Sequence, residues 1–300
     1  MQIVFGQLIV LYIFFFVGWL LGKTKKGLGD NAGVISTLLV NVFLPCKLFK
    51  SFSTNVTLSF LKERYFFPLA ALVLLAVLVG LGFLISRLLT KNEYERRVYT
   101  YSIPISNYAY LGYALIEAVF GESVLAEFML FVIPFVIFTY TVGYLLLVGG
   151  KENPLKKLLN PIVIAIVLGV IAGLTEIPMP DLITTAVSSA SACVGPLSML
   201  ITGITLSGFA FKELLTDVRA YIFSALRLIV LPAMAYLVCR LFKLDSIMPM
   251  VLIVTCMPCG LNPIVFPKLI GEDCKPGARL ALITHVLSLI TLPIWLSLIL

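Results

Sequence analysis

The chain has 300 residues, of which 60% are hydrophobic and only 12% are charged, and its mean hydropathy is +1.08. Average soluble domains carry about 25% charged residues, so this sequence cannot cover the surface of a soluble globule of its size. The composition excludes a cytosolic enzyme, a secreted domain and a disordered protein. Long unbroken apolar runs, such as residues 67–85, exclude a membrane β-barrel, whose strands alternate in polarity. An all-α polytopic membrane protein remains.

Ten segments are apolar enough to be membrane-spanning helices, since a span needs about 20 mainly apolar residues. In chain order they are residues 3–22, 31–50, 66–87, 98–120, 125–148, 160–176, 182–210, 218–242, 247–270 and 278–300. The first segment precedes its basic residues instead of following them, which is the reverse of a signal peptide. We therefore predict ten transmembrane helices.

The net charge of +7 comes from 22 Lys and Arg residues against 15 Asp and Glu residues. Basic residues are typical of the cytoplasmic connections of membrane proteins. Fifteen of the 22 fall in connections that are cytoplasmic if the N-terminus is outside, five fall in the opposite connections, and Lys47 and Arg227 fall within spans. The distribution predicts an even number of spans with both termini extracytoplasmic, and we expect the protein to lie in the plasma membrane. It gives no indication of nucleic acid as a partner.

The two halves of the chain show weak internal symmetry, which is typical of secondary transporters. The matches are mostly glycines and prolines, which mark bends and helix ends. At an offset of 151 residues they are Gly18 with Gly169, Gly22 with Gly173, Asp30 with Asp181, and Pro45 with Pro196; near 154, Pro104 matches Pro258. We expect residues 1–150 and 151–300 to be two five-helix repeats. The odd number of spans in each repeat places the two in opposite orientation.

The fourth and ninth spans carry matched interruptions. Each contains a proline, Pro104 or Pro258, followed three or four residues later by an amide, Asn107 or Asn262. Proline removes a backbone donor, and the freed carbonyls can face only protein or a watery cavity within a membrane. Paired interruptions indicate a transport site, and helix N-termini following them favour an anion. The alternative is two ordinary kinks whose asparagines bond to neighbouring helices.

Arg227, His285 and Lys47 are ionisable residues inside predicted spans and are functional candidates for that reason. Arg227 could neutralise a substrate carboxylate, or it could pair with Glu117 or a carbonyl group. His285, the single histidine of the sequence, is either a proton relay or a hydrogen-bond partner of a neighbouring helix. Lys47 follows Pro45 and is placed to attract an anion, although its side chain could also extend to the outer surface.

Other polar residues receive structural interpretations. We expect Glu117, Glu122 and Glu127 to be solvated, and Tyr99 and Tyr101 to be interfacial anchors.

The cysteines give no sign of metal or redox chemistry. Cys256 and Cys259 form a C-x-x-C spacing with no second pair nearby, so we interpret them as packing residues beside a helix break. No metal site, cofactor motif or nucleotide-binding loop is predicted.

Several motifs together resemble one family. Residues 41–49 (NVFLPCKLF) resemble the N-x-x-x-P-x-x-x-F segment of the auxin efflux carrier family. The further resemblances, in chain order, are the Pro104–Asn107 break, Phe-Gly-Glu at 120–122, Asn-Pro at 160–161, Ile-Pro-Met-Pro at 177–180, Gly-Pro at 195–196, Thr-Gly at 202–203 and Thr-Leu-Pro at 291–293. This family resembles plant PIN-type auxin carriers and bacterial permeases for malate or malonate.

The resemblance implies ten spans in inverted repeats, broken and crossing helices four and nine, and transport of small organic anions. It also implies a scaffold unit of spans one, two, six and seven, and a crossover unit of the remaining spans. The predicted substrate site comprises Asn107, Asn262, Pro104, Pro258, Ser106, Gly260 and Lys47, with His285 and Arg227 for coupling or charge relay. The short central connection fits a bacterial-type permease, whereas Lys47 stands where the family would have a small or apolar residue.

We predict a secondary carrier of small organic anions, not an enzyme, which works by alternating access in the lipid bilayer. A proton or a sodium ion would be the coupling ion, and a homodimer is compatible with the sequence. A sodium-coupled symporter of the bile-acid carrier type is the main rival, but apart from Glu117 the crossover spans offer few acids. An intramembrane enzyme could use His285, yet no Gly-x-Ser-x-Gly or His-Glu-x-x-His motif accompanies it. A receptor would be expected to carry a soluble effector domain.

Overall fold

A computed structural model describes residues 2–25, 28, 32–149, 159–176, 178–268 and 270–299. Within these ranges the chain is helical, and the only β-type pairing is one bridge between Ser106 and Cys259. Six of the described helices are long and apolar enough to cross a membrane, or seven if one bent pair is a single span. Helix occurs in all ten segments that the sequence indicated, but the remaining segments hold short or interrupted helices.

The first half of the chain begins with three long helical segments and continues with shorter pieces. Its elements are α1 (Gln2–Thr24), α2 (Ala32–Leu38), the π-helical turn η1 (Leu39–Phe43), α3 (Leu44–Asn55), α4 (Leu58–Arg64), α5 (Phe66–Leu89), α6 (Glu93–Ser102), the π-helical turn η2 (Tyr108–Gly112), α7 (Tyr113–Phe120), α8 (Glu122–Phe131), α9 (Ile133–Tyr140) and α10 (Val142–Val148). The helix axis bends by 51° where α8 meets α9, beside Pro134.

The second half also contains both long and short helices. Its elements are α11 (Pro161–Thr175), α12 (Asp181–Ser207), α13 (Phe211–Leu214), α14 (Val218–Ala225), the π-helical turn η4 (Leu226–Val230), α15 (Leu231–Leu241), α16 (Met248–Cys256), α17 (Asn262–Lys268) and α18 (Lys275–Leu296). Local signals set several helix starts. Asn92 caps α6, and Asp217 caps α14, each through a side-chain oxygen that accepts a backbone N–H.

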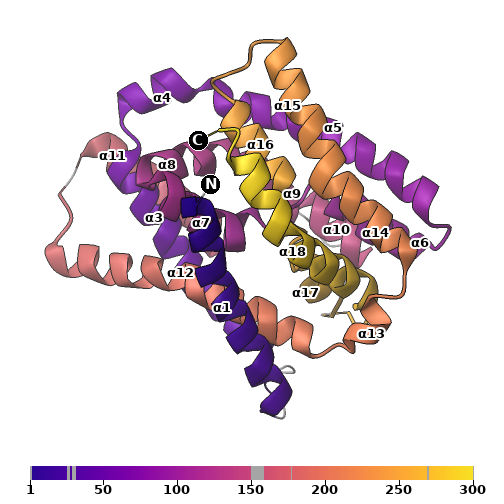
Figure 1. Cartoon of the computed structure of the whole chain (residues 1–300). Helices are drawn as coiled ribbons and strands as arrows, with labels where there is room; N and C mark the ends of the chain where they lie inside the picture. The colour runs from indigo at the N-terminus through magenta and orange to yellow at the C-terminus, as the bar shows by residue number, and fades with distance from the viewer. Residues whose placement is uncertain are drawn as a thin grey trace.

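Helices from both halves form one tightly packed group. The helix α1 packs along α12, and α3 packs against both α11 and α12 (Figure 1). Glycines allow the backbones to touch, since a Cβ at Gly18 would lie 2.2 Å from the carbonyl oxygen of Leu200. A Cβ at Gly173 would likewise lie 2.4 Å from the carbonyl oxygen of Val56, which joins α11 to the end of α3. Close approach through small residues is how helices associate within lipid.

A second group of helices carries the interrupted segments. The helix α5 packs on α6, α15 on α16, and α18 on both α14 and α16, with α14 and α15 together along the right side of the view (Figure 1). Large apolar side chains remain exposed on these helices, including Leu88 at 77%, Ile290 at 67% and Val73 at 66%. Contiguous apolar surface of this kind is stable in contact with hydrocarbon rather than water.

Candidate functional site

The two proline-containing interruptions lie against each other. The helix α6 ends two residues before Pro104, and α16 ends two residues before Pro258. The backbone N–H of Asn107 donates to the carbonyl of Pro258 at 2.7 Å, and Ser106 pairs with Cys259 in antiparallel fashion. Peptide groups that the breaks release from helical bonding therefore partly satisfy one another, as buried backbone within a membrane requires.

The helix α18 supports both interruptions from behind. His285 Nδ1 lies 2.7 Å from the carbonyl oxygen of Ala281, which can only accept, so Nδ1 carries the hydrogen. In the neutral ring Nε2 is then an acceptor, and it receives the Asn107 amide at 3.0 Å. The neighbouring Thr284 hydroxyl accepts the backbone N–H of Cys259 at 3.0 Å. One helical turn thus holds the asparagine of one break and the backbone of the other.

Asn262 is held differently from Asn107. Its Nδ2 donates to the hydroxyl of Tyr101 at 2.8 Å, across 161 residues of sequence. The prediction that Tyr99 and Tyr101 are interfacial anchors is wrong, because both side chains are at most 1% exposed. The short helix α6 ends inside the protein, so its last turn is core rather than membrane surface.

A cavity of about 50 Å³ opens beside the two interruptions. Four of the residues that the sequence predicted for the site line it: Asn107, Asn262, Ser106 and Gly260. Gly260 lies close to the other break, since a Cβ there would be 3.5 Å from the carbonyl oxygen of Ser106. The Ser106 hydroxyl is buried without a hydrogen-bond partner among the described residues. Pro104 is buried at the start of its break.

Sequence reasoning missed an aromatic group around this cavity. The remaining polar lining residues are tyrosines and a threonine from the two broken spans of the first half: Tyr108, Tyr110, Tyr113, Tyr140 and Thr139. The sequence does contain a pattern that indicates this aromatic lining, because three of these tyrosines follow the first interruption at positions 108, 110 and 113. The cavity therefore combines amides, hydroxyl groups and aromatic rings, which suits a small polar ligand with an apolar part.

Lys47 lies outside the lining of this cavity. Its ammonium group forms an ion pair with Glu117 of α7, and the lysine is only 2% exposed. The three outer glutamates that we expected to be solvated are 19–44% exposed, and each also forms an ion pair: Glu122 with Lys50, and Glu127 with a guanidinium group at 3.0 Å. A buried ammonium is stable only when paired, so α3 and the end of the fourth segment are joined here.

Arg227 also lies outside the cavity lining. It is fully buried in η4, and its Nη2 donates to the carbonyl of Val254 at 3.1 Å. Of the two structural alternatives, pairing with a carbonyl is the one observed, since Glu117 pairs with Lys47 instead. The guanidinium group thus lies behind the second interruption, one turn before the end of α16.

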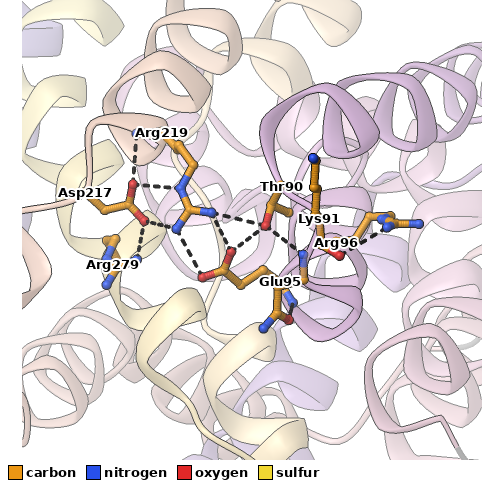
Figure 2. A network of polar contacts seen from close by, with 8 residues as sticks. Thr90, Lys91, Glu95, Arg96, Asp217, Arg219 and Arg279 are labelled. Carbon is orange, nitrogen blue, oxygen red and sulfur yellow. Dashed lines mark hydrogen bonds and ion pairs between the residues drawn. The ribbon is translucent and has the colours of Figure 1, made fainter.

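A charged network joins the starts of three helices (Figure 2). Arg219 Nη1 lies 2.9 Å from Glu95 at the start of α6, and its Nη2 lies 2.8 Å from Asp217 before α14. Arg279, in the first turns of α18, binds the same Asp217 carboxylate at 2.6 Å. The Arg219 guanidinium holds the pKa of the Asp217 carboxyl below its ordinary value. The network fixes the relative positions of helices that carry or support both interruptions.

No cluster of three or more His, Cys, Asp or Glu side chains suited to a metal ion occurs in the described ranges. Cys256 and Cys259 are buried free thiols at the second break.

Comparison with known proteins identifies the type of protein to which this site belongs. Residues 3–296 match the family described as membrane transport protein, which confirms the resemblance to the auxin efflux carriers that the motifs indicated. An uncharacterized transporter of Methanocaldococcus jannaschii is 27% identical over 278 residues, covering 89% of each chain. The uncharacterized transporter YfdV of Escherichia coli strain K12 is 23% identical over 309 residues, covering 97% of this chain and 96% of the relative.

Proposed function

Because this chain belongs to the membrane transport protein family, which includes the auxin efflux carriers, we propose that it is a secondary carrier of small organic anions. The substrate carboxylate binds between the two interruptions, at the Asn107 and Asn262 amides. The observation that carries the proposal is the meeting of the breaks at a cavity that both asparagines line. Paired interruptions of this kind are the usual location of transporter sites.

The chemistry of the lining suits a carboxylate. Each asparagine side chain uses one amide N–H on a protein partner, and an amide group carries two such donors. The Tyr108–Phe120 helix begins directly after Asn107, so its N-terminal peptide dipoles add a positive potential there. The proposed substrate contacts are Asn107, Asn262 and Ser106, and Gly260 leaves space beside them. Lys47 lies outside the cavity lining and forms an ion pair with Glu117.

The volume of the cavity indicates which state the structure represents. Ligand pockets are commonly about 300–1,000 Å³, whereas this cavity is about 50 Å³ and has room for a few water molecules. We therefore interpret the structure as an occluded form. Substrate entry requires the second helix group to move against the group built from α1, α3, α11 and α12, which is alternating access.

Packing supports two inverted five-helix repeats, residues 1–150 and 151–300. The matched glycines Gly18 and Gly169 lie within α1 and α11, and each of these helices packs on the second span of the other half: α1 on α12, and α11 on α3. Exchanged contacts of this kind are expected from two copies of one unit related by a pseudo-two-fold axis. Of the matched pair Asp30 and Asp181, Asp30 lies outside the described residues.

Flux measurements in proteoliposomes test the proposal. Purified protein is reconstituted, and uptake of labelled malonate, malate and indole-3-acetate is measured at set membrane potentials. Asn107→Ala and Asn262→Ala are expected to reduce uptake at least tenfold, because each removes an amide donor to the carboxylate. Asn55→Ala is the matched control, since within the described part of the chain that amide donates to its own helix, at the carbonyl of Ser51. Absence of flux for all three anions would refute the substrate class, and normal flux in both cavity variants would refute the site.

A further inference from the structure

Arg227 is a fully buried arginine that no carboxylate neutralises. Its Nε and Nη1 atoms have no hydrogen-bond partner, and it forms no ion pair, among the residues that the structure describes. An arginine side chain stays protonated inside proteins. Removing such a charge from water is costly unless a negative potential compensates it, so its position needs a physical explanation.

The compensating potential comes from the interrupted helix α16. The Val254 carbonyl, which accepts from Arg227 Nη2 at 3.1 Å, belongs to the last turn of α16 before the break. Carbonyl groups in the last turn of a helix have no partners within it, and together they form the negative end of the helix dipole. A cation is favoured at this end, as the bound guanidinium group shows.

The same type of position has a known use in carriers built on broken helices. Unwound carbonyls and the C-terminal ends of half-helices are where such carriers coordinate a coupling cation such as Na⁺. Here a covalently attached cation already binds at that end. Its five N–H donors offer more contacts than one carbonyl uses, so Nε and Nη1 remain available for carbonyl groups of the break as it moves.

We propose that Arg227 is a built-in cation that occupies the place of a coupling sodium ion, so that anion transport by this protein is independent of Na⁺. This inference rests on the proposed carrier function. It argues against the sodium-coupled alternative for this chain, because the positive charge of the guanidinium group would repel a sodium ion placed beside it.

Two measurements test it. First, thermal unfolding of the detergent-purified wild type is followed in NaCl, KCl and choline chloride at equal ionic strength, and the three midpoints are expected to agree. Second, uptake of labelled malonate, malate and indole-3-acetate is compared with Na⁺ and with choline on both sides of the membrane, and equal rates are expected. A midpoint raised specifically by Na⁺, or uptake that requires Na⁺, would overturn the proposal.

Substitutions make the test specific to the charge. Arg227→Gln is expected to lower uptake at least tenfold, whereas Arg227→Lys keeps the charge and retains at least a third of it. Arg240→Gln is the matched control, because that arginine is 58% exposed at the far end of the same helical segment. Normal uptake by Arg227→Gln would overturn the proposal, and if this variant does not fold, Arg227→Lys and the salt comparison decide. If the wild type moves no anion, the proposed substrate class fails, while the unfolding midpoints still decide the role of Arg227.

Discussion

Asn107 and Asn262 each follow a proline interruption but have different partners. Asn107 is 3% exposed and bonds to His285 on α18, whereas Asn262 is half-buried and bonds to Tyr101 on α6. The helix α18 supports both breaks, but its His285 faces Asn107, whereas the side chain of Asn262 faces Tyr101 in the last turn of α6. Two amides with unequal supports can bind the one carboxylate with different strength.

At the residue scale, His285 is expected to act by positioning Asn107. His285→Ala removes the acceptor of the Asn107 amide, and one hydrogen bond contributes about 1 kcal/mol, so the KM for the anion should rise about five- to tenfold. The maximal rate should change less, since the lost bond orients the binding group. Concentration-dependent uptake in proteoliposomes measures both. Ser288→Ala, one turn later on α18, is the control, and an unchanged KM in His285→Ala would contradict this role.

A second residue-scale prediction concerns Asp217. Its pKa is held down by the Arg219 guanidinium, so its charged form stabilises the folded state above the ordinary pKa near 4. This contribution is lost as the pH falls through the lowered pKa. The thermal midpoint in detergent should therefore fall from pH 5 to pH 3, and Asp217→Asn should show a lower midpoint at pH 7 with a flatter pH profile.

The control for this experiment is Asp245→Asn. Asp245 is 68% exposed and lies 3.5 Å from its arginine partner, so its removal should leave the wild-type pH profile in place. Asparagine at position 217 can still cap α14, which separates the effect of charge from that of capping. Identical profiles for Asp217→Asn and the wild type would show that the network contributes no pH-dependent stability.

At the element scale, the backbone contact between α1 and α12 depends on glycine. A Cβ at Gly203 would lie 2.0 Å from the carbonyl oxygen of Phe15, whereas a Cβ at Gly80 in α5 meets nothing within 4 Å. Gly203→Ala should lower the thermal midpoint by roughly 5 °C or more, because overpacking costs about 1–3 kcal/mol or above. Gly80→Ala is the control and should be neutral or slightly stabilising. Equal thermal midpoints for Gly203→Ala and Gly80→Ala would mean that α1 and α12 can move apart at little cost in stability.

At the scale of the whole molecule, the ion pairs fall into two groups at opposite ends of the even-numbered segments. The network of Glu95, Asp217 and Arg279 joins the starts of the fourth, eighth and tenth segments. Lys47–Glu117 and Lys50–Glu122 join the end of the second segment to the region where the fourth ends and the fifth begins. In a chain whose ten spans cross the membrane in alternating directions, all even-numbered spans run in the same direction. The two groups therefore support the proposed topology.

Cysteine labelling of intact cells tests the orientation. The charge distribution places α4 outside and the connection before α14 inside, so Ser59→Cys should react with a membrane-impermeant maleimide in intact cells. Thr216→Cys should react only after permeabilisation. Both residues are exposed, and the background carries Cys193→Ser because that native thiol is exposed. The reverse labelling pattern would place both termini in the cytoplasm.

The class of protein, the helical segments and the positions of both interruptions could be predicted from the amino-acid sequence. Apolar length and proline act locally, so each can be recognised without knowledge of the neighbouring helices. The packed helices were needed to show that Tyr101 and His285 bond to the two asparagines, that Lys47 pairs with Glu117, and that Arg227 bonds to a half-helix carbonyl. These contacts join residues 27 to 178 positions apart, and no local pattern specifies which polar groups meet when broken helices cross inside a membrane.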